Sequence, residues 1–296
     1  MSLVSVVVAT YRREKELKNA LESLANQQFD DFEIVLVDDN ANDEWNQMVL
    51  DIVSEFRVAH KDVPLNYIVN KPNQGSAKTR NIGIEACVGE YITFLDDDDV
   101  YLPEKIQKQV AFMQNGEYDY SVTDLLLYTE DDKIIDRRVR KYIKDLSPQA
   151  LQRYHLKYHI TGTDTMMFKK DYIVSIGGFP GINVGDEFYL MQRAIEAGGK
   201  FGYLPGCDVK AYVHIGEGGL SSGDGKILGE NALFEYKKSF FHELHSKDIR
   251  YVKMRHFAVL AFAELRRKKF IPFFINGIKA FFIAPIACLK LFAFER

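Results

Sequence analysis

The sequence is poor in cysteine and tryptophan and has no long uncharged apolar run. Its 296 residues include three cysteines, one tryptophan and eight prolines. Three widely spaced cysteines do not suit a disulfide framework or a paired-cysteine zinc or redox site, so we expect a reducing, cytoplasmic location. The first nine residues lack the basic start and the cleavage site of a signal peptide, so none is expected. With 47% hydrophobic and 27% charged residues, the composition excludes disordered and collagen-like chains.

Charge is distributed unevenly along the chain. Ten Lys/Arg and three Asp/Glu lie between Asp248 and Arg296, which leaves a net charge of −11 on the rest of the chain. The basic run at residues 266–269 precedes an apolar, aromatic segment that charges and prolines interrupt, so it is too short for a membrane span of about 20 residues. We expect either an in-plane amphipathic segment on an anionic membrane surface or helices that pack on the body or on a second subunit.

Strands and helices alternate regularly through the first hundred residues. Continuous apolar, β-branched runs predict strands that are covered on both faces, and apolar residues at helical spacing predict the helices between them. The expected strands are residues 3–9, 33–37, 65–69 and 91–95, and the expected helices are residues 14–28, 44–56 and 77–87. These steps predict an α/β fold with a doubly wound, mostly parallel sheet.

The pattern is less regular after residue 100. We expect a helix to about Gln114, strands near residues 118–128 and 134–139, mixed structure to about His214, and helices from about Ile227 onward. The chain then divides into a first domain at residues 1–225, with halves at 1–100 and 101–225, and a basic, apolar and helical segment at 226–296.

Polar side chains follow each of the four expected strands. These short segments are residues 10–13, 38–40, 70–73 and 96–99. In open α/β sheets, ligands bind beyond the carboxyl ends of the strands. We therefore expect these segments to converge on one edge of the sheet.

The most acidic of these segments is Asp96–Asp99. Four adjacent carboxylates repel one another, and a fold tolerates them best when a cation or hydrogen-bond donors neutralise them. Strand alternation would place Asp96 and Asp98 on one side, as a pair of carboxylates that suits Mg²⁺ or Mn²⁺. The alternative is a solvated acidic turn.

Two further segments have both a structural and a functional interpretation. Residues 38–40 are ordinary turn formers, but a carboxylate there could accept a hydrogen bond from a pyrimidine N–H or from ribose hydroxyls. Lys78 and Arg80 begin the third helix and would bring positive charge to a diphosphate, or would be surface cations.

Three separated segments resemble family 2 glycosyltransferases of the GT-A fold. They are VSVVVATYRR at residues 4–13, QQFDDFEIVLVDDNANDE at 27–44, and NKPNQGSAKTRNIGIEACVGEYITFLDDDDVYLPEKI at 70–106. The resemblance implies a Rossmann-like, nucleotide-binding first half and an inverting, metal-dependent transfer from a nucleotide-sugar, with UDP favoured. Lys78 and Thr79 depart from the small residues that are usual in the family.

The resemblance also implies roles for individual residues. Ala9, Tyr11 and Asp39 would flank the base, Arg80 would lie near the nucleotide, Asp96 or Asp97 would lie by the ribose, and Asp98 would bind the metal. A weaker match at residues 177–199 implies that Asp186, or else Glu187, is the catalytic base; the alternative is that Asp186 only caps a helix. His214 would reach the metal or the diphosphate, or is a plain buried histidine.

The expected function is therefore sugar transfer to a hydroxyl of a growing glycan or a lipid-linked saccharide of the cell envelope, without a nucleic-acid partner. Two alternatives remain at this point. Asp96–Val100 also fits the pattern of aspartate-nucleophile phosphatases, which use Mg²⁺. The chain could instead be a catalytically silent module that binds a nucleotide-sugar or a membrane.

Overall fold

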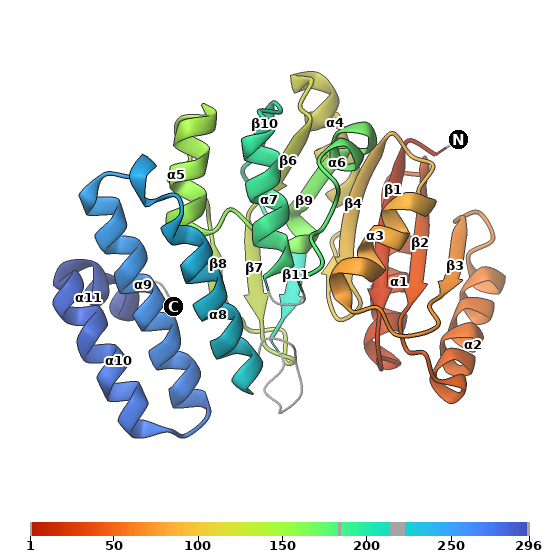
Figure 1. Ribbon diagram of the computed structural model, residues 1–296. Coiled ribbons are helices and arrows are strands. Elements are labelled where there is room, and N and C mark those ends of the chain that lie inside the picture. Colours follow the sequence, from red (N-terminus) through yellow and green to blue (C-terminus); the bar gives the residue numbers. More distant parts are fainter. Residues whose placement is uncertain (1, 183–184, 214–222, 295–296) are drawn as a thin grey trace. The chain divides into compact units, whose positions relative to one another are not determined.

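A seven-stranded, mostly parallel sheet dominates the first part of the chain in the computed structural model, which describes residues 2–182, 185–213 and 223–294 (Figure 1). Its strands are β1 (Val4–Thr10), β2 (Phe32–Asp38), β3 (Leu65–Val69), β4 (Tyr91–Asp96), β6 (Tyr120–Thr123), β9 (Met166–Lys169) and β10 (Phe201–Leu204). They lie in the order β10-β6-β9-β4-β1-β2-β3, and β9 is antiparallel to both of its neighbours. The predicted α/β class and the mostly parallel sheet are confirmed.

Helices cover both faces of β1, as its uninterrupted apolar sequence predicts. The main helices of the first hundred or so residues are α1 (Lys15–Ala25), α2 (Asp43–Ala59), α3 (Ser76–Ala86) and α4 (Lys105–Gly116). Val6 and Val8 belong to a buried cluster with Leu17 and Leu21 of α1. On the other face α3 approaches closely, because a Cβ at Gly83 would lie 2.4 Å from the Val7 side chain. Parallel strands that are buried in this way hold the ends of β1, β2 and β4 in fixed register.

A second, four-stranded sheet lies in the same part of the chain. It contains β5 (Val100–Tyr101), β7 (Leu125–Tyr128), β8 (Ile134–Arg138) and β11 (Val209–Tyr212), in the order β5-β11-β7-β8. The region expected to be strand near residues 118–128 is thus two strands in two sheets, which separate at the buried Asp124. The acidic residues 97–99 form the passage from β4 to β5 and so from one sheet to the other.

The chain divides into two compact units that do not follow the expected limit at residue 225. Unit 1 comprises Met1–Pro148 and Ile160–Val213, and unit 2 comprises Gln149–His159 and His214–Arg296. Unit 1 also contains the short helices η1 (Thr163–Thr165) and α6 (Lys170–Ser175), and α7 (Asp186–Glu196). The helices of unit 2 are α5 (Pro148–Tyr158), α8 (Gly223–Lys238), η2 (Phe241–Glu243), α9 (Ser246–Arg266), α10 (Phe270–Ile283) and α11 (Pro285–Phe294).

Unit 2 is helical throughout its described residues, which confirms the predicted helical C-terminal part. Asp248 of α9 is buried and accepts from Arg153 and Lys157 of α5 at 2.6 Å each, which explains why α5 groups with helices far along the chain. Met254 of α9 and Ala280 of α10 share a buried apolar cluster. Among the described residues, no helix combines the length and the apolar character needed to cross a membrane.

Candidate active site

The carboxyl ends of β1, β2 and β4 meet at one edge of the large sheet, as expected. In the strand register Ala9 lies opposite Val37 on one side and opposite Asp96 on the other. Two residues predicted to contact a nucleotide, Ala9 and Asp96, are therefore immediate neighbours. Tyr11 follows at the surface and is 46% exposed, and the Arg12 guanidinium carbon lies 5.2 Å from the centre of the Tyr11 ring.

The acidic run does not alternate in the way that a strand would require. β4 ends at Asp96, and the Asp99 N–H donates to the Asp96 carbonyl at 3.1 Å, which closes a turn. The expectation that Asp96 and Asp98 face one way is therefore wrong. The physical reason is that the two-residue period holds only inside a strand.

Asp97 and Asp98 turn toward the segment that follows β1. The Asp97 carboxylate accepts from the Thr10 hydroxyl at 2.7 Å and from the Tyr11 N–H at 3.1 Å. Asp98 pairs with Arg13 at 2.8 Å. Burial and the neighbouring Asp98 charge raise the pKa of Asp97 to about 7. These contacts fasten the acidic turn to the end of β1.

Asp96 and Asp99 turn instead toward Asp164, a residue of η1 that the sequence analysis did not single out. Ligand atoms of these three carboxylates lie within 4.8 Å of one another. Asp164 is buried and accepts from the Asp96 N–H at 2.7 Å. Carboxylate oxygens in this arrangement fit Mg²⁺ or Mn²⁺, which take hard oxygen ligands. Asp98 is not one of the three, and its role as a metal ligand stays a prediction.

Burial and mutual repulsion shift the pKa values of two of these three carboxyl groups. Burial and then Asp164 raise the pKa of Asp99 well above its usual value. Burial and then Asp96 raise the pKa of Asp164 to about 7. The Asp99 carboxyl also accepts from the Tyr212 N–H at 2.8 Å, which joins the acidic turn to β11.

Arg80 is the cation at the centre of the site. It extends from α3 and donates to Asp96 at 2.6 Å and to Asp186 at 2.8 Å. Burial alone would lower the pKa of Arg80, but the two carboxylates outweigh it and raise that pKa. That Arg80 lies near a nucleotide stays a prediction. The guanidinium joins the end of β4 to the start of α7.

Asp186 and Glu187 form the first turn of α7. Gly185 precedes them with a φ of 74°, a left-handed conformation that glycine adopts without strain. Asp186 is buried, and its carboxylate pairs with Arg80 and accepts from the Glu187 N–H at 3.0 Å. Burial and then the Asp186 charge raise the pKa of Glu187 to about 7. Two adjacent carboxyl groups thus occupy different electrostatic environments.

The segment before α7 is fastened to α3. The Asn81 side chain donates to the Phe179 carbonyl and accepts from the Phe179 N–H, each at 2.8 Å. The Phe179 ring lies 5.4 Å from the Arg80 guanidinium carbon. Because these contacts flank the Arg80 ion pairs, they place the start of α7 beside α3, although about a hundred residues separate the two in the sequence.

Asp39 organises the segment between β3 and α3. Its carboxylate accepts from Asn70 at 2.9 Å, from the Gln74 N–H at 2.7 Å and from the Gly75 N–H at 2.8 Å. Asp39 is buried, and these three bonds account for its burial. A contact to a nucleotide base stays a prediction. Lys78 points to solvent from the first turn of α3.

A buried lysine donates hydrogen bonds to residues of β4 and β5. The sequence analysis did not identify it. Lys105 of α4 donates to the Thr93 hydroxyl at 2.6 Å and to the Tyr101 hydroxyl at 2.7 Å. Burial lowers the pKa of Lys105 well below its usual value. Tyr101 in turn donates to the Phe94 carbonyl. A lysine in a helix pattern looks like a surface residue, so only the tertiary structure reveals this role.

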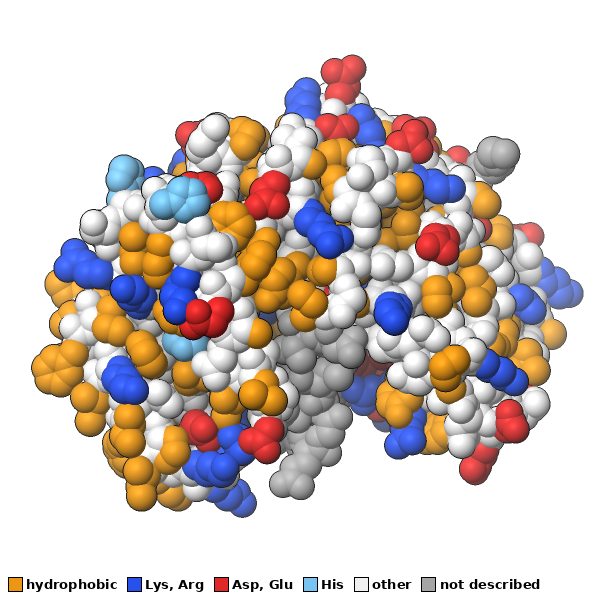
Figure 2. Space-filling model, in the orientation of Figure 1, with side chains coloured by type: hydrophobic (Ala, Val, Ile, Leu, Met, Phe, Trp, Pro, Cys, Tyr) orange, Lys and Arg blue, Asp and Glu red, His pale blue; other side chains and the backbone are white. Residues whose placement is uncertain are grey.

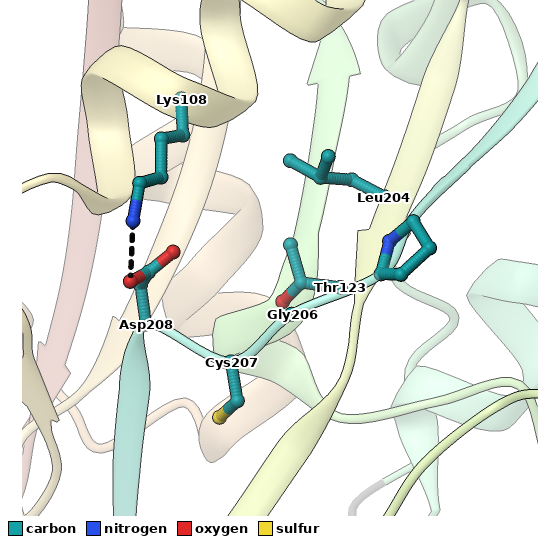
Figure 3. Close-up of a pocket in the computed structure, with 7 residues that line it drawn as sticks. Lys108, Thr123, Leu204, Gly206, Cys207 and Asp208 are labelled. Atoms are coloured by element: carbon teal, nitrogen blue, oxygen red, sulfur yellow. Dashed lines mark hydrogen bonds and ion pairs between the residues drawn. The ribbon is translucent and has the colours of Figure 1, made fainter.

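His214, predicted to reach the metal or the diphosphate, lies outside the described residues. A cavity of about 400 Å³ is lined by residues around the turn between β10 and β11 (Figure 3). Lys108 of α4 donates to Asp208 at 3.1 Å beside it. None of its seven lining residues is one of the predicted site residues, so this cavity is separate from the acidic edge.

Comparison with known proteins identifies relatives and the fold. An uncharacterized glycosyltransferase of Methanocaldococcus jannaschii is 34% identical over 173 residues, which are 56% of each chain, so this chain spans little more than half of that relative. The UDP-Glc:alpha-D-GlcNAc-diphosphoundecaprenol beta-1,3-glucosyltransferase WfaP of Escherichia coli is 32% identical, over 67% of this chain and 73% of WfaP. S. aureus TarS 1-349 in complex with UDP-GlcNAc aligns with a TM-score of 0.62 at 16% identity, over 95% of this chain and 91% of TarS 1-349.

The structural match to TarS shows the fold, which is that of GT-A glycosyltransferases. The model of glycosyl transferase family 2 matches residues 5–176, which include β1 to β4, the acidic turn, Arg80 and Asp164. Because that match covers more than half of the sequence, and WfaP is related over two thirds of it, the chain belongs to glycosyl transferase family 2.

Proposed function

We propose that this chain transfers a sugar from a nucleotide-diphospho-sugar, with UDP as the nucleotide, to a hydroxyl of a growing glycan or a lipid-linked saccharide. Family membership supports the transferase activity. The name of WfaP contains a UDP-sugar donor and a diphosphoundecaprenol acceptor, and the TarS crystals hold UDP-GlcNAc, which supports the donor and acceptor classes. The single observation that carries the proposal is the pairing of the Arg80 guanidinium with the carboxylates of both Asp96 and Asp186.

The nucleotide is proposed to lie along the carboxyl ends of β1 to β4. Tyr11 offers an exposed ring for the base, with Ala9 and Asp39 nearby in the predicted base site. Asp96 and Asp97 would lie by the ribose. This order follows the strand register, in which the end of β1 lies between the ends of β2 and β4.

Glu187 is the proposed catalytic base, with Asp186 as a positioning residue. The sequence favours Asp186 as the base, but the Asp186 carboxylate pairs with Arg80 and accepts from the Glu187 N–H. Glu187 has a pKa of about 7, which suits a group that must take a proton from an acceptor hydroxyl near neutral pH. One base and one in-line displacement at the anomeric carbon give inversion.

The proposed metal is Mg²⁺ or Mn²⁺. Asp98 is its ligand by resemblance, and Asp96, Asp99 and Asp164 are the three carboxylates whose spacing fits it. When bound, the ion would supply positive charge to the diphosphate leaving group. Arg80 holds Asp96 within that carboxylate group and Asp186 beside the base, so a single side chain sets the positions of both.

A transfer and hydrolysis assay with a panel of UDP-sugars tests the proposal. We expect turnover of at least one donor in the presence of Mn²⁺, and we expect Glu187→Gln to bind UDP but not to turn the donor over. Glu196→Gln, at the exposed end of the same helix, is the matched control and should keep wild-type activity. Donor binding without any turnover in wild-type protein would support the silent binding module instead.

Membership of glycosyl transferase family 2 argues against the aspartate-nucleophile phosphatase alternative. A cytoplasmic location stays part of the proposal. It is supported by the three cysteines, which are all free in the structure. Absence of phosphatase activity, and failure to trap an aspartyl-phosphate at Asp96, would complete the distinction.

A further inference from the structure

The outward side of α10 and α11 is apolar instead of polar. Seven large side chains on these helices are between 56% and 78% exposed. They are Phe270, Ile271, Phe274, Ile278, Phe282, Ile286 and Leu289. We call these seven residues the apolar face. Figure 2 shows hydrophobic side chains gathered over this part of unit 2, with Lys and Arg near them.

The arrangement on α10 is regular. At about 100° per residue, its five members of the apolar face fall within an arc of roughly 120°. The opposite side of α10 packs inward, where Ala280 is buried against Met254 and Ala258 of α9. A surface helix normally directs its apolar stripe to the core and its polar side to water. In α10 Ala280 and Ile283 pack inward, but five large phenylalanine and isoleucine side chains face outward.

The charge around the apolar face is of one sign. Residues 265–294 contain six Lys/Arg and no Asp/Glu. Arg267 is held by Glu264 and Asp224. Arg266, Lys268 and Lys269 are exposed just before α10 begins, and Lys279 and Lys290 are exposed on α10 and α11. Exposed cations beside exposed phenylalanine and isoleucine match the side chains that enter a lipid interface next to anionic headgroups.

We propose that the apolar face lies on an anionic membrane surface, with α10 in the plane of that surface. α10 has 14 residues and is about 21 Å long, which is shorter than a hydrocarbon core of about 30 Å. A second copy of the chain is a poorer occupant, because a two-fold interface would bring the same six cations against one another. This inference goes beyond the proposed transfer reaction and is tested without turnover.

Co-sedimentation of the full chain with lipid vesicles tests the proposal. Vesicles of phosphatidylcholine alone are compared with vesicles of equal parts phosphatidylcholine and phosphatidylglycerol. We expect binding to the mixed vesicles to be at least about 10-fold tighter and to weaken as salt is added. Wild-type protein that binds neither kind of vesicle would overturn the proposal.

Substitutions on the apolar face distinguish specific membrane docking from non-specific binding through exposed apolar side chains. The triple variant Phe274→Ser, Ile278→Ser, Phe282→Ser should lose vesicle binding. The matched control Val58→Ser, Val88→Ser, Val174→Ser removes three exposed apolar side chains from unit 1 and should bind as wild type does. Replacing Lys268 and Lys269 by serine should weaken binding roughly 30-fold. Equal binding by both triple variants would overturn the proposal.

Two further measurements keep the outcomes distinct. A single tryptophan at position 282, introduced as Phe282→Trp with Trp45→Phe, should shift its emission to the blue on anionic vesicles and be quenched by brominated lipid. Hydrolysis of a soluble UDP-sugar should be the same for wild type and both triple variants, so failure of membrane docking is not confused with failure of the transferase proposal. A dimer that the Phe274, Ile278 and Phe282 substitutions dissociate would assign the face to a second copy and overturn the proposal.

Discussion

The acidic edge of unit 1 and the apolar face of unit 2 depart from the usual distribution of side chains in opposite directions. Unit 1 buries carboxyl groups that would be more stable in water, whereas unit 2 exposes hydrocarbon that would be more stable in a core. The acidic edge is compensated inside the fold, since Arg80 pairs with Asp96 and Asp186, and the Thr10 hydroxyl and the Tyr11 N–H donate to Asp97. No described residue of unit 2 compensates the apolar face.

The difference indicates what each region needs in order to work. A site whose charges are balanced by its own residues is preorganised, and a ligand has only to complete it. A face without internal compensation gains stability only when something external covers it. Substitutions in the first region should therefore change stability and turnover, and substitutions in the second should change only association.

The largest expected effect is the loss of turnover in Glu187→Gln. Removing a general base lowers kcat by roughly 10²–10⁴-fold. Asp186→Asn should lose less, because Arg80 still holds a neutral amide near the base. Steady-state kinetics with UDP-sugar donors, together with calorimetric UDP binding, measure both effects. If Asp186→Asn were the more severe change, the two roles would have to be exchanged.

The next effect separates the two regions by stability. Arg80→Met leaves the buried Asp186 carboxylate and the half-buried Asp96 carboxylate without their cation and should lower the free energy of unfolding by about 3 kcal/mol. Phe282→Ser, on the apolar face, should change it by less than about 0.5 kcal/mol. Urea titrations followed by circular dichroism give both values. As a second reference, Arg13→Met breaks a more exposed pair and should cost at most about 1 kcal/mol.

A pH dependence should follow from Glu187. Its pKa is about 7 in the folded chain and 4.5 as the ordinary value, so between these limits the folded chain holds a proton that the unfolded chain has lost. The contribution of Glu187 to stability therefore falls as pH rises from about 4.5 to 7, while activity rises with half its maximum near pH 7. Unfolding titrations over this range measure the free energy of unfolding of wild type and Glu187→Gln, and the two profiles should differ by the Glu187 contribution. The kcat profile of the wild type measures the rise in activity. Parallel stability profiles would contradict the assignment.

The smallest effect concerns the backbone before the proposed base. Gly185 has a left-handed φ, and open space surrounds the position of an added Cβ, so Gly185→Ala should cost only the conformational strain of about 1–2 kcal/mol. Gly181 has the same open surroundings but its φ is not left-handed, so Gly181→Ala should be close to neutral. Thermal unfolding of the two variants provides the comparison. Equal stability would show that the α7 start is not held in this conformation.

The sequence was most informative where burial is symmetrical. β1, β2 and β4 are mainly apolar because both faces of the sheet are covered there, so their positions and the convergence of their polar ends could be predicted. Strand alternation failed at Asp98 because the chain turns after Asp96. The two-residue alternation predicts which way side chains point inside a strand, but it does not predict where the strand ends.

Long-range pairing was beyond the reach of local patterns. Arg80 and Asp186 are 106 residues apart in the sequence. Asp164 belongs to no motif that we identified in the sequence, although its carboxylate accepts from the Asp96 N–H. A buried Lys105 looks like any helical lysine until the hydroxyls of Thr93 and Tyr101 are brought to it. Such groups are identified only when the fold places their partners.

The antiparallel strand β9 has a practical consequence for any shortened form of the protein. β9 lies between β4 and β6, so the parallel strands β1 to β4 obtain their last neighbour from residues 166–169, far along the chain. A fragment that stops before β9 would present the outer edge of β4 as a row of unpaired amide and carbonyl groups, and such an edge recruits strands from other molecules. The first half by itself should therefore aggregate instead of folding as an independent fragment.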